Sequence, residues 1–181
     1  MAKLVSATYG DALFDVAMEK NMVDVFYEEA KAVYDAIGDN RELAGFLNHP
    51  KINKDEKIKT VEDIFSRFVS KEMTGFLVTI INKDRSNELS NILLYFMDRV
   101  REFKRIGRAY VTTAFELSDS MKSKVKNKLL MTTDYREFDM IYTVDESLIG
   151  GMVIRIGDRV VDSSIKNRLT ELSRELNRID V

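Results

Sequence analysis

Residues 145–172 constrain the fold of this chain more than any other stretch, because they predict two strands, a tight turn and a helix in close succession. Residues 152–156 are mostly β-branched and apolar, which favours a strand. Gly157 and Asp158 form a two-residue turn whose twist matches flanking strands, so residues 159–161 are expected to pair back on the first strand. The segment therefore predicts a β-hairpin.

The hairpin lies between a glycine-containing turn and an amphipathic helix. Gly150 and Gly151 permit backbone angles that a Cβ forbids. Asp162, Ser163 or Ser164 can cap the helix, because a short polar side chain accepts the free amide hydrogens of a first turn. The apolar residues of this helix recur at helical spacing: Ile165, Leu169, Leu172, Leu176 and Ile179.

The same segment carries many residues at fixed spacings that together form a signature. They are Asp145, Ser147, Gly151, Val153, Ile154, Arg155, Gly157, Asp158, Val161, Asp162, Ser164, Arg168 and Leu169. This set resembles the carboxy-terminal signature of the delta-subunit family of the F-type ATP synthase, whose mitochondrial counterpart is the oligomycin sensitivity-conferring protein.

The resemblance extends to the amino-terminal half of the chain. Residues that look like the family's first helix, and like the end of its fifth, are Ala7, Tyr9, Ala12, Leu13 and Ala17, then Phe76, Leu77, Asn82 and Arg85. One departure is Gly10, which stands where the family often has alanine after the tyrosine and costs some helix propensity.

The composition excludes several classes of protein. The chain has 181 residues, 45% of them hydrophobic, no cysteine and a formal net charge of −2. Disulfides, thiolate metal sites and cysteine nucleophiles are therefore excluded. No apolar run approaches the roughly 20 residues that span a bilayer, and no signal-peptide core follows Met1. We expect a soluble chain without direct membrane insertion.

The first hundred residues read as six short helices, so the fold class is mainly α with an amino-terminal six-helix bundle. The expected helices are residues 3–19, 22–37, 41–48, 54–67, 71–83 and 87–106. The expected caps are Asn21 with Asp24, Asn40, Asn53 with Glu56, and Ser70; the expected stops are Gly38 and the His49-Pro50 pair.

After Gly107 the period of the pattern changes. Residues 109–115 and 138–144 favour strands, and Ser118 with Asp119 caps a helix between them. With the hairpin and last helix this gives β-α-β-β-β-α, a small α+β domain in which two helices cover one face of a sheet. We expect two domains, residues 1–106 and residues 107–181.

The residues that enzymes use are scarce. His49 is the only histidine, so a Ser-His-Asp arrangement has no imidazole to spare. For the same reason a multi-histidine metal site cannot be built. Its position before Pro50 favours a stabilising role at a helix end. No phosphate-binding GxxxxGK[ST] segment is present. We expect no catalytic residues, no metal and no cofactor.

Two basic clusters leave alternatives open. The first, on the sixth expected helix, is Arg101, Lys104, Arg105 and Arg108; the second is Lys122, Lys124, Lys126 and Lys128. Exposed aromatics are not interleaved with them, so nucleic-acid binding is not expected. A solvated face suits the lysines, and contact with an acidic protein partner is an alternative for the arginines.

The first and fifth helices carry more apolar surface than one core face needs. The first has an arc with Val5, Tyr9, Ala12, Leu13 and Val16 and a nearly opposite arc with Ala7, Phe14 and Met18; the fifth has Met73, Phe76, Leu77, Val78, Ile80 and Ile81 over roughly 200°. Both helices are either buried all round or form a groove for a partner helix.

The resemblance implies the second alternative. In the delta family the first and fifth helices accept the amino-terminal helix of an alpha subunit, and the α+β domain binds the stalk's b subunits. The groove residues implied are Tyr9, Ala12, Leu13, Phe76, Leu77 and Ile80. The second-domain signature residues implied are Gly151, Arg155, Gly157, Asp158, Asp162, Ser164 and Arg168.

The function implied is that of a non-catalytic peripheral-stalk connector. It would link the catalytic head to membrane-anchored b subunits, so that rotary torque is resisted during proton-driven ATP synthesis. The resemblance also implies a single copy of this chain in a hetero-oligomer. That complex would place the chain peripherally on the cytoplasmic side of the bacterial inner membrane. The alternatives are a stand-alone helix-binding adaptor or regulatory module and, less favoured, an enzyme using surface carboxylates.

Overall fold

The computed structural model describes the backbone of residues 2–179 and the side chains of residues 4–175. The chain divides into two compact units, Met1–Arg101 and Glu102–Val181, which we call the helical unit and the α+β unit. The division falls within the last turns of the sixth helix, a few residues before the expected boundary. The fold class predicted from the sequence is confirmed.

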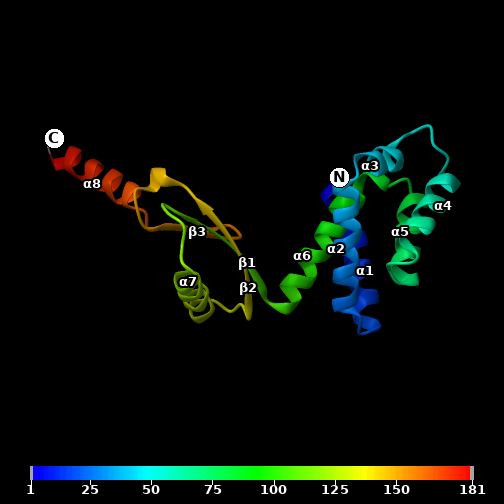
Figure 1. The fold of residues 1–181 in the computed structure, drawn as a ribbon, viewed down its shortest axis with the longest axis horizontal. Coiled ribbons are helices and arrows are strands. Elements are labelled where there is room, and N and C mark those ends of the chain that lie inside the picture. Colours follow the sequence, from blue (N-terminus) through cyan, green and yellow to red (C-terminus); the bar gives the residue numbers. More distant parts are fainter. Residues whose placement is uncertain (1, 180–181) are drawn as a thin grey trace. The chain divides into compact units, whose positions relative to one another are not determined.

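The helical unit contains the six predicted helices (Figure 1). They are α1 (Ala2–Glu19), α2 (Val23–Asp39), α3 (Arg41–Asn48), α4 (Lys54–Phe65), α5 (Lys71–Asn82) and α6 (Leu89–Lys104), with a 3-10 turn, η1 (Ser86–Glu88), before α6. Their buried faces meet in one core, whose largest fully buried side chains include Phe26, Phe96, Leu47, Met73, Leu77 and Ile80.

Three predicted caps in the helical unit are confirmed by hydrogen bonds to side-chain oxygens. The Oδ1 atom of Asn40 accepts the backbone N–H of Leu43 at 3.0 Å at the start of α3. Asn53 accepts a weaker bond at 3.4 Å at the start of α4. The hydroxyl of Ser70 accepts the N–H of Met73 at 3.2 Å at the start of α5. Each bond satisfies an amide that the helix itself leaves free.

Other predicted helix ends were wrong. Asn21 does not cap α2; it adopts a positive φ of 54°, and Met22 precedes the helix without a side-chain cap. Gly38 does not end α2, which continues to Asp39 because Asn40 serves as the boundary between two helices. The sixth helix ends at Lys104 and not at residue 106, since Arg105 turns the chain with a φ of 56°.

The α+β unit is built on a four-stranded sheet of order β2-β1-β3-β4. The strands are β1 (Ile106–Thr113), β2 (Glu137–Val144), β3 (Met152–Ile156) and β4 (Arg159–Asp162), and the helices are α7 (Asp119–Thr132) and α8 (Ile165–Ile179). The β1 and β2 strands are parallel, joined through α7, and the other neighbours are antiparallel. The predicted order β-α-β-β-β-α is confirmed.

The expectation that two helices cover one face of this sheet was wrong. Among the helices of the described residues, α7 alone lies over the sheet, on the face that contains the buried residues Ala109, Val111 and Phe138. The last helix, α8, runs away from the strands (Figure 1). Its apolar residues are therefore not used to build the core of this unit.

Gly10, the departure from the family pattern, has a packing reason. It is buried in α1, and a Cβ there would collide with the ring of Tyr95 in α6. The Tyr95 hydroxyl also donates to the carboxylate of Asp11 at 3.2 Å. The glycine thus makes room for a tyrosine that ties α6 to α1.

We predict that Gly10→Ala destabilises the helical unit. The added methyl group overpacks the contact with Tyr95, which typically costs about 1–3 kcal/mol of unfolding free energy. The matched control is Gly45→Ala in α3, where a Cβ meets nothing within 4 Å, so that only the helix propensity gain of about 0.5–1 kcal/mol remains. Thermal unfolding followed by circular dichroism should show opposite shifts, and equal shifts would contradict the packing explanation.

Candidate functional site

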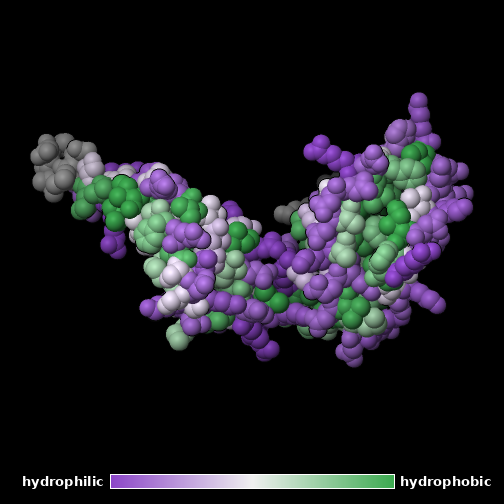
Figure 2. Space-filling model, in the orientation of Figure 1, coloured by the Kyte–Doolittle hydropathy of each residue, from purple (hydrophilic) through white to green (hydrophobic). Residues whose placement is uncertain are grey.

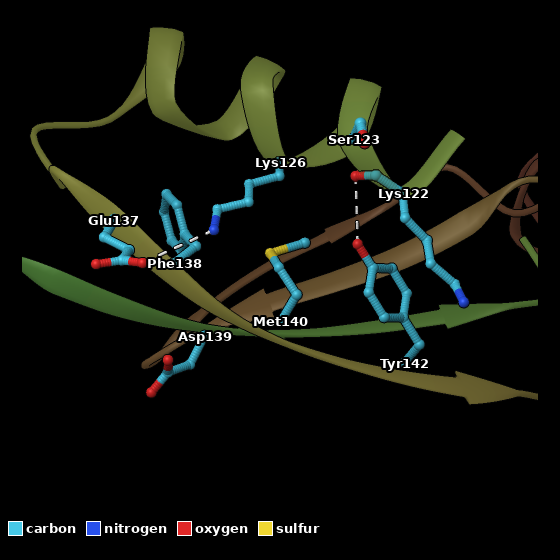
Figure 3. Close-up of a pocket in the computed structure, with 8 residues that line it drawn as sticks. All are labelled: Lys122, Ser123, Lys126, Glu137, Phe138, Asp139, Met140 and Tyr142. Carbon is cyan, nitrogen blue, oxygen red and sulfur yellow. Dashed lines mark hydrogen bonds and ion pairs between the residues drawn. The ribbon is translucent and has the colours of Figure 1, made fainter. Parts of the chain in front are cut away.

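A shallow surface pocket of about 390 Å³ lies between α7 and β2 (Figure 3). It is lined by Lys122, Ser123, Lys126, Glu137, Phe138, Asp139, Met140 and Tyr142. The Tyr142 hydroxyl donates to the backbone carbonyl of Lys122 at 3.3 Å, and burial raises the pKa of this tyrosine. A protonated tyrosine, lysines and carboxylates suit binding better than nucleophilic catalysis.

The remaining chemistry of the described residues is sparse. His49 is exposed at the end of α3, where its Nδ1 atom accepts the backbone N–H of Lys51 at 3.2 Å. Within residues 4–175 no group of histidine, aspartate and glutamate side chains is arranged to hold a metal ion. None of the helices over residues 2–179 is long and apolar enough to cross a membrane.

The expected groove residues fall into two groups. Leu13, Leu77 and Ile80 are core residues, at most 3% exposed, and so are unavailable at the surface. Tyr9 and Phe76 are half-buried, and Ala12 is exposed.

Helix α1 uses residues of both predicted arcs for the core, because its buried stripe runs between them. Leu13 comes from one arc and Phe14 from the other, and both are buried. The outer members, Val16 and Met18, are exposed. On α5, Phe76 and Val78 flank the buried stripe and remain partly exposed. Both helices therefore combine a core face with residual apolar surface.

Two polar contacts hold the start of α5 in place. Lys20, directly after α1, pairs with Glu72 in the first turn of α5, and this hydrogen bond lowers the pKa of Glu72. The Glu29 carboxylate of α2 accepts both the backbone N–H of Ser70 at 2.7 Å and its hydroxyl at 2.8 Å. The end of α1 and the start of α5 are thus fixed close together.

The carboxy-terminal signature forms a network at the start of α8. The Oδ1 atom of Asp162 accepts the backbone N–H of Ser164 at 2.8 Å, and the buried Ser164 hydroxyl accepts the N–H of Asn167 at 3.1 Å. Gly151 has a φ of 74°, and a Cβ there would collide with the backbone carbonyl of Ser163. These residues fix the point at which α8 leaves the sheet.

The other signature residues have separate places. Arg155 lies over the ring of Tyr110, 4.6 Å from its centroid, on the face of the sheet opposite the buried one. Gly157, with a φ of 55°, and Asp158 form the hairpin turn. Arg168 is exposed on α8. The signature residues therefore do not line one common pocket.

The largest unexpected feature is the apolar stripe of α8. Ile165, Leu169 and Leu172 are 43%, 53% and 55% exposed; the side chains of Leu176 and Ile179, which continue the repeat, lie outside the described residues. Figure 2 shows hydrophobic surface along this helix. The alternating spacing of four and three residues is the signal that could have identified a stripe for another helix, since it is the heptad spacing of coiled coils.

The first basic cluster does not line one helix as expected. Arg105 lies in the turn after α6 and Arg108 lies in β1. Arg101 pairs with Asp98 at 2.9 Å and lies over the ring of Tyr27. The arginines are thus dispersed over different elements.

The fold and its surfaces define a class: a protein with a helical unit and an α+β unit whose exposed apolar helix faces suit contacts with other chains. Residues 5–176 match the family described as ATP synthase delta (OSCP) subunit. The chain is 55% identical to the ATP synthase subunit delta of Lachnoclostridium phytofermentans over the full length of both, and 36% identical to that of Desulforamulus reducens over 95% of this chain and 94% of the relative. The chain belongs to this family, and is therefore a non-catalytic peripheral-stalk component of an F-type ATP synthase.

The fold has a counterpart among solved structures. A chain of the cryo-EM structure of the Toxoplasma gondii mitochondrial ATP synthase hexamer superposes with a TM-score of 0.74 at 21% identity, covering 94% of this chain and 96% of that one. The resemblance read from the signature is confirmed at the level of the family, and the family assignment favours a stalk subunit over a free-standing adaptor.

We predict different costs for two glycine substitutions. Gly151→Ala should strongly destabilise the α+β unit, because the Cβ meets backbone that cannot move without displacing α8. Gly157→Ala should cost only the left-handed backbone penalty of about 1–2 kcal/mol, since a Cβ there meets nothing within 4 Å. Denaturant titration compares the two, and equal losses would contradict the assigned contact.

We predict that the network at the start of α8 weakens in acid. Hydrogen bonds from Ser164 lower the pKa of Asp162 below its ordinary value of 3.8. Its stabilising effect is present above that value and is lost as the pH falls through the folded pKa. The Ser164 amide resonance in an NMR titration should report a midpoint below 3.8. Asp162→Asn, which keeps an acceptor oxygen, should abolish the titration; a midpoint at or above the ordinary value would refute the network.

Proposed function

We propose that this subunit connects the catalytic head of the synthase to the peripheral stalk through two separate surfaces. The helical unit binds the amino-terminal helix of an alpha subunit, and the α+β unit binds the b subunits. A single copy acts at the cytoplasmic side of the bacterial inner membrane, peripherally. The observation that carries the proposal is the α8 stripe, because a helix that leaves its own sheet with three large aliphatic residues exposed is suited to packing against another helix.

The helical unit supports its half of the proposal through the residual apolar surface of α1 and α5. The contact residues proposed are those that packing against the core leaves half-buried or exposed: Tyr9, Ala12, Val16, Phe76 and Val78. The fully buried Leu13, Leu77 and Ile80 act beneath them, by fixing the helices on which they stand. Figure 2 shows hydrophobic surface in the region of α4 and α5.

The mechanism is mechanical. The rotor exerts torque on the head, and the connector must hold the head while the torque lasts. Desolvated apolar contacts suit this role, because differences in affinity between related complexes lie mostly in the dissociation rate. A non-catalytic subunit needs no more than two such contacts and a body that does not unfold between them.

We predict that a charge introduced on each surface weakens binding of one partner and leaves binding of the other unchanged. Phe76→Glu should weaken binding of a synthetic alpha amino-terminal peptide, with Asn82→Glu on the exposed side of α5 as control. Leu169→Glu with Leu172→Glu should weaken binding of the soluble part of b, with Asn167→Glu and Thr170→Glu as control. We expect losses of about tenfold or more, measured by calorimetry.

The pattern of the four variants decides the proposal. Losses by the controls equal to those of the test variants would mean that the surfaces are not the contacts. A loss of both partners by one variant would indicate unfolding, which circular dichroism detects. Full binding of both partners by all variants would overturn the proposal.

A further inference from the structure

One edge of the sheet in the α+β unit is long and open. The order β2-β1-β3-β4 places β2 at the end of the sheet, and within the described residues no strand pairs with its outer side. Its eight residues all pair with β1, so every second residue directs its N–H and C=O groups outward. Such an edge is a template for an added strand. The opposite edge, β4, has only four residues.

A basic rim lies beside this edge. Lys122 and Lys126 stand one turn apart on the side of α7 that faces β2 (Figure 3). Their side chains are 33% and 39% exposed, so both are held against the sheet without being buried. The Lys122 amine lies 5.5 Å from the ring centroid of Tyr142, and the Lys126 amine lies 4.0 Å from the Glu137 carboxylate. The side chains of Met140 and Tyr142 form an apolar floor between them.

We propose that the β2 edge and the lysine rim of α7 bind an extended acidic segment of a neighbouring protein chain, which adds to the sheet as a fifth strand. Backbone hydrogen bonds to β2 supply the alignment, and the two lysines select acidic side chains on the face toward α7. This surface is distinct from the α8 stripe and from α1 and α5, so the inference goes beyond the connector function.

The sheet also specifies what the segment carries on its other face. Residues of an added strand alternate between the two faces of the sheet. Asp139 points away from α7 in Figure 3, and Ile141, on the same face, is 39% exposed. A segment whose residues alternate between acidic and uncharged or basic therefore fits. Nucleic acid fits less well, because Glu137 and Asp139 oppose a continuous run of phosphates.

The test uses the full chain and an acetylated, amidated octapeptide of alternating glutamate and threonine, followed by heteronuclear NMR. We expect amide shifts concentrated in residues 137–144 and around residues 122–126. The same peptide with alternate amides N-methylated loses its edge hydrogen bonds and should bind about tenfold more weakly. A lysine–threonine octapeptide should not bind.

The chain offers a matched control for the lysines. The double variant Lys122→Glu with Lys126→Glu should bind the glutamate peptide about tenfold or more weakly. The double variant Lys124→Glu with Lys128→Glu makes the same charge change at exposed positions of α7, and should lower the affinity by about threefold at most. Lys122→Gln with Lys126→Gln repeats the test if the first double variant loses its circular dichroism. All variants keep α8 and the helical unit unchanged.

Several results would overturn the inference. Equal losses in the two double variants would show unspecific attraction to a basic helix. Unchanged affinity of the N-methylated peptide would exclude strand addition. Tighter binding of an oligothymidylate of equal charge would assign the surface to nucleic acid, and absence of shifts at about 2 mM peptide would exclude even a weak site.

Discussion

The close approach of Gly151 to the backbone of Ser163 is the contact on which the use of the α+β unit depends. Gly151, the residue before β3, and Ser163, the residue after β4, meet there without room for a side chain. The hydroxyl and backbone N–H of Ser163 both donate to the carbonyl of Met152 at 2.9 Å, which fastens the same point from the other side. Because these contacts fix the junction, α8 can leave the sheet with its apolar residues exposed and still keep a defined direction within its unit.

The helical unit, in contrast to α8, buries many of its apolar residues in its own core. Its core draws on all six helices and includes the buried side chains of Phe26, Phe96 and Met97. The apolar surface that remains on α1 and α5 is therefore a surplus, left after the core is complete. Two polar contacts hold the end of α1 and the start of α5 in place, Lys20 with Glu72 and Glu29 with Ser70. Neither contact covers the apolar surface of these helices.

Several features that depend only on neighbouring residues were predicted correctly from the sequence. Features that depend on packing against a second element were predicted less well. The hairpin and the caps at Asn40 and Ser70 depend on neighbouring residues, and the structure has them as predicted. The assignment of Leu13 to the surface failed because helical periodicity shows that α1 has two apolar arcs, but which positions are buried depends on the helices packed around it. The α8 stripe was read as sheet cover for the same reason: an apolar heptad pattern does not say which partner it meets. The open β2 edge left no pattern to read, since strand order is a tertiary property.

The two surfaces proposed for this chain would also explain why a connector needs no single contact of exceptional strength. When one contact opens, the other still holds the chain near its partner, so reclosing is intramolecular and occurs at an effective concentration set by the tether. The chain is released only if both contacts are open together. Each unit must therefore remain folded while its partner is absent, and the core around Phe96 and the junction at Gly151 support this. Stability of the units and retention of the stalk are thus two consequences of the same packing.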